Sequence, residues 1–81
     1  MKWVPMQWGS EKFEWVQLSP GRWGLVGRKA EVFFHDKRGW GAMVDGKFLA
    51  YYSSRGRAME AVVGFLIYEQ KLRQAQAKEV G

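Results

Sequence analysis

The side chains that could support catalysis are few. The chain of 81 residues has one histidine and no cysteine, so zinc sites built from these ligands and thiol chemistry are excluded. His35 precedes Asp36, but neighbouring residues of a strand point to opposite faces and cannot orient each other as a catalytic triad requires. The eight acidic residues show no spacing typical of a paired general acid and base. We therefore expect a protein that is not an enzyme and holds no metal or cofactor.

Basic and aromatic side chains are the candidates for binding. The net charge is +5, and 16% of the residues are aromatic. A basic balance favours acidic partners such as DNA or RNA. Aromatic rings beside positive charge can stack bases and hold phosphates. The candidates for nucleic-acid or partner binding are Phe33, Trp40 and Tyr51 as stacking groups, Lys29, Lys47, Arg55 and Arg57 as phosphate contacts, and His35, Lys37 and Arg38 beside them.

Two pairs of basic residues have a specific place in the predicted structure. Arg55 and Arg57 lie at the start of a predicted helix, where free backbone N–H groups and the positive end of the dipole suit a phosphate. Lys37 and Arg38 lie at the tip of a loop, from which they could reach a phosphate backbone. For both pairs the alternative is ordinary solvated surface charge.

Turn signals divide the first 52 residues into short runs. Asp45-Gly46 is typical of a type I′ hairpin turn, and Asp36 to Gly39 suits a four-residue loop. The runs between turns are rich in aromatic and β-branched residues, which favour strands. The predicted strands are 12–18, 22–26, 29–35, 40–44 and 47–52.

The rest of the chain predicts one long helix. Ser53 or Ser54 suits the N-cap, and the following residues up to about 78 are mostly strong helix formers. We predict a single α+β domain spanning 1–81, in which an antiparallel meander of three to five strands packs on a helix at about 54–78. Residues 1–11 form an N-terminal arm or an edge strand.

The turns also predict the strand register. A two-residue turn at Asp45-Gly46 pairs Trp40 with Tyr51, and a four-residue loop at 36–39 pairs His35 with Trp40. The core face under the helix then carries Ala30, Val32, Phe34, Gly41, Met43, Phe48, Ala50 and Tyr52, with Gly41 and Ala50 leaving room for Gly64. The opposite face carries Lys29, Glu31, Phe33, His35, Trp40, Lys47, Leu49 and Tyr51.

Three other interpretations of the apolar residues remain. The residues Trp3, Trp8, Trp15 and Trp23 could fold over the aromatic face and bury it. The same face could bind a protein, because exposed aromatic residues are typical interface anchors. The helix is apolar nearly all round at 61–68, which would suit a homodimer.

Composition also bears on the compartment. The absence of cysteine favours a reducing compartment, and the first eight residues lack the apolar core of a signal peptide. The longest apolar run, 61–68, is far shorter than the roughly 20 residues of a membrane span. We therefore expect a cytoplasmic protein with no membrane partner.

Three strands followed by a helix resemble the three-stranded DNA-binding domains of the AP2 and integrase arm-binding type. The resemblance covers about 29–66 and includes Gly39-Trp40-Gly41-Ala42, Asp45-Gly46-Lys47 and Ser54-Arg55-Gly56-Arg57-Ala58. It implies a sheet lying in the major groove, with Lys29, His35, Trp40 and Lys47 facing DNA. In size and style the chain is also similar to small phage-encoded accessory proteins that inhibit host enzymes or defence complexes by direct contact.

Overall fold

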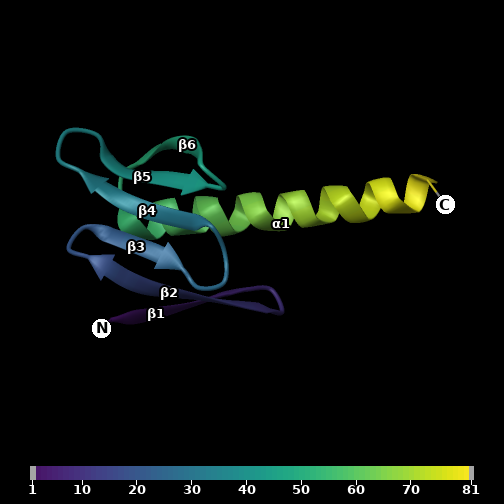
Figure 1. Cartoon of the computed structure of the whole chain (residues 1–81), viewed down its shortest axis with the longest axis horizontal. Helices are drawn as coiled ribbons and strands as arrows, with labels where there is room; N and C mark the ends of the chain where they lie inside the picture. The colour runs from purple at the N-terminus through teal and green to yellow at the C-terminus, as the bar shows by residue number, and fades with distance from the viewer. Residues whose placement is uncertain (1, 81) are drawn as a thin grey trace.

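A six-stranded antiparallel sheet and one helix make up the fold (Figure 1). The computed structural model describes residues 2–80, with side chains described as far as residue 75. The strands pair in the order of the sequence, as a simple meander. The elements are β1 (Trp3–Trp8), β2 (Glu11–Ser19), β3 (Arg22–Leu25), β4 (Ala30–His35), β5 (Gly39–Val44), β6 (Lys47–Tyr52) and α1 (Arg55–Val80).

The predicted α+β class is confirmed, with one strand more than the three to five expected. The additional strand is β1, which pairs along its whole length with β2 and forms one edge of the sheet. Pro5 is tolerated there because an edge strand does not need every backbone N–H for pairing. No helix in the described part of the chain is both long and apolar enough to cross a membrane.

The turn between β5 and β6 has the predicted geometry. Asp45 and Gly46 both have positive φ, 52° and 79°, as a type I′ turn requires. Val44 therefore pairs with Lys47, and Met43 with Phe48. The twist of this turn matches the twist of the strands, so the last hairpin forms where the sequence indicates.

The turn between β4 and β5 is one residue shorter than predicted. Gly39 belongs to β5 and pairs with His35, so the loop contains residues 36–38 only. Gly39 has a φ of 95°, and a Cβ atom there would collide with the carbonyl oxygen of Tyr52. Glycine is therefore required at this position, and the predicted pairing of His35 with Trp40 is wrong.

A bulge in β6 makes a second one-residue change. Met43 pairs with Phe48 while Ala42 pairs with Ala50, so Leu49 is the extra residue. Leu49 packs against the core although the predicted alternation put it on the opposite face.

Together these two changes redistribute the residues of β5 and β6. Trp40 lies on the helix face, where its ring contacts Phe34 at 5.5 Å. Gly41, Met43 and Phe48 were predicted for the core and instead lie on the opposite face. Phe33 and Tyr51 remain on the face predicted for them, since β4 has the predicted alternation and the bulge restores the register before Tyr51.

The core lies between the helix and its face of the sheet. Its strand residues come from β2 to β5, and Trp15 is completely buried. The predicted core positions Ala30 and Val32 are confirmed, whereas Phe34 is 54% exposed. The buried residues are Phe13, Trp15, Trp23, Leu25, Ala30, Val32, Ala42, Val44, Ala58, Met59, Val62, Val63 and Leu66.

The helix begins where its capping residue predicts. The Ser54 side-chain oxygen accepts a hydrogen bond from the backbone N–H of Arg57, at 3.2 Å, as an N-cap does. The helix packs on β4, β5 and β6 and then extends beyond the sheet (Figure 1). Gly64 faces the ring of Trp8, not Gly41 and Ala50 as predicted.

Candidate ligand-binding face

One face of the sheet is left without a covering element in the described part of the chain. We call it the open face; it carries the side chains that alternate with the core residues. Its described residues include Trp3, Val16, Leu18, Arg22, Glu31, Phe33, His35, Met43, Phe48 and Tyr51.

The tryptophans do not bury this face. Trp15 and Trp23 are core residues, and Trp8 lies against Gly64 of the helix. Trp3 does share the open face but lies in β1, at the opposite edge from β6, and is half exposed. The hypothesis that tryptophans fold over the predicted binding face is therefore wrong for the described structure.

Three aromatic rings gather on the open face over β4 and β6. We call Phe33, Phe48 and Tyr51 the aromatic cluster. The ring centroids lie 4.8 Å apart for Phe48 and Tyr51, 6.3 Å for Phe33 and Tyr51, and 6.4 Å for Phe33 and Phe48. Such tilted and edge-on contacts suit the ring quadrupoles. Phe48 nevertheless remains 47% exposed, so the cluster presents aromatic surface to solvent.

Gly41 determines how the cluster sits on the sheet. It pairs with both Phe33 and Tyr51, and a Cβ atom at this position would lie 2.5 Å from the Phe33 ring. The missing side chain lets the Phe33 ring lie directly over the β5 backbone. The aromatic cluster therefore forms a platform that lies close to the sheet, with Gly41 beneath the Phe33 ring.

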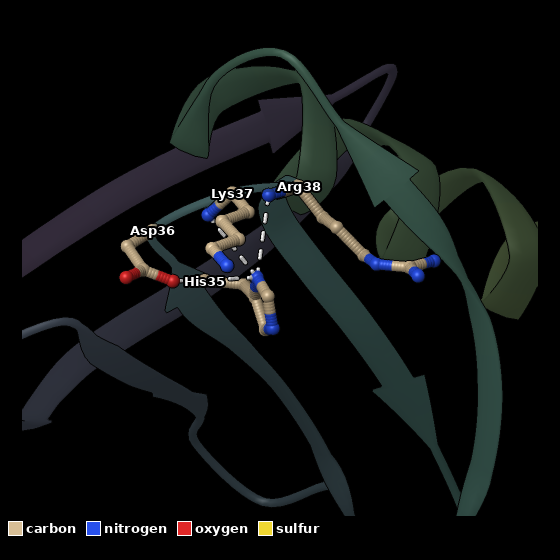
Figure 2. Close-up of polar contacts among 4 residues, drawn as sticks. All are labelled: His35, Asp36, Lys37 and Arg38. Atoms are coloured by element: carbon tan, nitrogen blue, oxygen red, sulfur yellow. Dashed lines mark hydrogen bonds and ion pairs between the residues drawn. The ribbon is translucent and has the colours of Figure 1, made fainter.

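The turn after β4 places polar groups beside this platform (Figure 2). His35 Nδ1 accepts hydrogen bonds from the backbone N–H groups of Lys37, at 3.3 Å, and Arg38, at 3.2 Å. The His35 ring lies 5.5 Å from the Tyr51 ring. The Arg38 guanidinium lies over the same Tyr51 ring, 5.6 Å from its centre.

Basic residues lie at both ends of the open face. Lys29 precedes β4 at one end and is exposed. Lys47 pairs with the core residue Val44, so it lies on the helix face and not on the face predicted for it. Lys37 and Arg38 lie at the other end, in the turn after β4. The six residues of β4 separate these ends by about 20 Å, at roughly 3.3 Å a residue.

The middle of the face carries an ion pair. Arg22 Nη1 lies 3.6 Å from Glu31 Oε1, and both side chains are partly exposed. An exposed pair of this kind adds little stability. Beside it Leu18 covers Gly24, where a Cβ atom would lie 3.0 Å from the leucine.

Four of the predicted site residues lie away from the open face, and Lys47 is the first of them. Arg55 places its guanidinium 4.5 Å from the centre of the buried Trp23 ring, on the helix side. Arg57 is exposed in the first turn of the helix, and Trp40 packs toward the core. The structure thus brings Phe33, Tyr51, His35 and Arg38 into contact, with Lys37 in the same turn.

Sequence reasoning missed three residues of the open face, namely Arg22, Gly41 and Phe48. Phe48 and Gly41 were assigned to the core because both depend on the register of β5 and β6. The signal for Phe48 was its position next to the Asp45-Gly46 turn, opposite Met43, but only the bulge shows which face that pair occupies.

The described residues include no group of three histidine or acidic side chains that could hold a metal ion. Comparison with protein family models, curated proteins and solved structures gives no match.

Proposed function

We propose that this protein binds single-stranded nucleic acid across its open face. The observation that supports the proposal is the aromatic cluster, which is partly exposed and lies between basic residues at two ends of the same face. Aromatic side chains stack on bases, and lysine and arginine neutralise phosphates. Phe33, Phe48 and Tyr51 are the stacking groups in this proposal, with Lys29, Lys37 and Arg38 as phosphate contacts.

A single strand suits this face better than a duplex. Bases in a duplex are stacked on one another and offer only their edges to a sheet in the major groove. The centre of the open face carries phenylalanine rings, which form no hydrogen bonds with base edges, and Glu31, which repels the paired phosphate backbones of a duplex. The duplex mode implied by the resemblance also used Trp40, which lies on the helix face.

The length of the site sets the size of the ligand. A path of about 20 Å along β4 from Lys29 to Arg38 is short. We therefore expect a site of about 4 nucleotides, which is the size of the smallest single-strand sites on comparable domains.

A cytoplasmic location is part of the proposal. The cytoplasm contains nucleic acid and is reducing, and a reducing environment suits a chain without cysteine.

Fluorescence anisotropy of labelled 12-mers tests the proposal. Single-stranded DNA, single-stranded RNA and the matching duplexes are titrated with protein at several salt concentrations. We expect saturable binding that favours single strands and weakens log-linearly with salt, with a slope of about −2 for three phosphate contacts. Absence of binding at low salt would contradict the proposal for a domain of net charge +5.

A protein partner is the second candidate, as an inhibitor or adaptor that acts by direct contact. The observation that favours it is a shallow pocket beside the aromatic cluster, lined in part by Leu18, Leu25, Ala30 and Met43. Aliphatic groups add nothing to base stacking but are normal at protein interfaces. Binding of this kind should depend little on salt, and nucleic acids should not compete with it.

A further inference from the structure

Two hydrogen bonds from the turn orient the imidazole of His35 and favour one tautomer. Its Nδ1 accepts from two backbone N–H groups, those of Lys37 and Arg38, so this nitrogen must carry the lone pair. The proton of the neutral ring is therefore on Nε2. Gly39, whose positive φ closes the turn against Tyr52, holds the backbone that makes these two bonds.

The protonated nitrogen points away from the turn. In Figure 2 the second ring nitrogen of His35 lies on the side of the ring opposite Lys37 and Arg38. The hydrogen bonds found for this ring among the described residues are both at Nδ1. The side chain is 39% exposed, and its ring contacts Tyr51 at 5.5 Å. An oriented N–H donor thus lies at the edge of the aromatic cluster.

The charged groups around the ring do not compete for this donor. Asp36 Oδ1 lies 3.7 Å from Nδ1, on the side of the turn. The Arg38 guanidinium lies over the Tyr51 ring and can only donate hydrogen bonds. Nε2–H of this partly exposed ring therefore remains open to an acceptor from solvent or from a ligand.

We propose that His35 Nε2–H donates a hydrogen bond to an oxygen of the bound single strand, and that His35 is a positioning and specificity residue of the open face. This inference rests on the proposed function. The oxygen belongs either to a phosphate or to a base carbonyl, since both are acceptors within the same ligand. The turn fixes the donor before binding, so little side-chain freedom is lost when the ligand arrives.

The variant His35→Asn separates the two nitrogens. An asparagine side-chain oxygen can accept the same two N–H groups, as in an Asx turn, but places nothing at the position of Nε2. We expect protection of the Lys37 and Arg38 amides from hydrogen exchange to persist. The affinity should fall about three- to tenfold, the effect of one hydrogen bond.

The matched control is Lys37→Ala, in the same turn. It removes a charge but leaves both backbone donors to Nδ1 in place. This variant should reduce the salt slope and lower the affinity equally for every single strand, because it removes a phosphate contact and no oriented donor.

Titration of both variants with 12-mers of thymidine and of adenosine identifies the oxygen. An equal loss for His35→Asn on both assigns a phosphate oxygen, and a loss on thymidine alone assigns a base carbonyl, which adenine lacks. Unchanged affinity on both, while the wild-type protein binds, overturns the donor role and leaves the proposed function intact. Failure of the wild-type protein to bind either strand overturns both.

The tautomer has its own measurement, which needs no ligand. Nitrogen-15 NMR of the neutral imidazole should show an unprotonated Nδ1 and a protonated Nε2. A proton on Nδ1 in the neutral ring would overturn the assignment whether or not the protein binds nucleic acid.

Discussion

Both faces of this sheet carry apolar and aromatic residues, but these residues are mostly buried on the helix face and partly exposed on the open face. On the helix face Val32 and Ala42 are fully buried, and two tryptophans pack with them. On the open face, residues of the same strands keep much of their apolar surface exposed: 47% of Phe48 and 56% of Leu18. The difference is the helix, which covers one face of β4, β5 and β6 and leaves the other free.

The comparison shows that aromatic content alone does not indicate the core. Burying an aromatic side chain removes a large apolar area from water, and on the helix face that area contributes to folding. On the open face the rings contact mainly one another, and the remaining apolar surface is available to a ligand. Substitutions should therefore affect stability on one face and binding on the other.

The largest expected effect is at Trp15. Its side chain is completely buried, so Trp15→Ala should cost about 3–5 kcal/mol, a large part of the roughly 5–15 kcal/mol that stabilises a domain. Trp15→Phe should cost much less, because the indole N–H has no hydrogen-bond partner in the described structure. Urea unfolding of both variants measures the difference, and equal losses would show that the indole N–H matters more than the packing.

The next largest effect is a loss of stability from a substitution on the open face. Gly41→Ala places a Cβ atom 2.5 Å from the Phe33 ring, so the ring must move and the domain should lose about 1–3 kcal/mol. Gly56→Ala is the matched control, since nothing lies within 4 Å of its new Cβ atom. It should be neutral or up to about 1 kcal/mol more stable. Thermal unfolding compares the two, and an unperturbed Gly41→Ala would contradict the described position of Phe33.

Sequence patterns predicted the elements better than the faces. The Asp45-Gly46 turn, the cap at Ser54 and the alternation along β4 all depend on local chemistry and could be predicted. They were sufficient for the meander, the helix and the placement of Phe33 and Tyr51.

The assignment of β5 to a face depended on single residues. Gly39 could end the loop or begin the strand, and both choices accommodate its positive φ. In the structure Gly39 begins the strand, and there it lies close to the backbone of Tyr52, 13 residues later in the chain. The bulge at Leu49 likewise turns that side chain toward the core. Packing of this kind does not appear in a local pattern, so Trp40 and Phe48 were assigned to the wrong faces.

A smaller effect separates the basic residues. Arg38→Gln removes a proposed phosphate contact on the open face, so the salt slope should become shallower by about 0.7 and the affinity should fall severalfold at low salt. Arg57→Gln is the control, because Arg57 lies in the first turn of the helix and outside the open face. It lowers the net charge equally, and an equal change in slope would show that net charge rather than position controls binding.

The measurement that tests the central claim most directly compares two exposed phenylalanines on opposite faces. Phe48 and Phe34 are 47% and 54% exposed, so alanine at either position should leave the fold intact. With a thymidine 12-mer, Phe48→Ala should lose the stacking energy of one base, about 1–3 kcal/mol, or roughly five- to 150-fold in affinity. Phe34→Ala should bind as the wild-type protein does. Equal affinities of the two variants, or a greater loss for Phe34→Ala, would contradict the assignment of ligand binding to the open face.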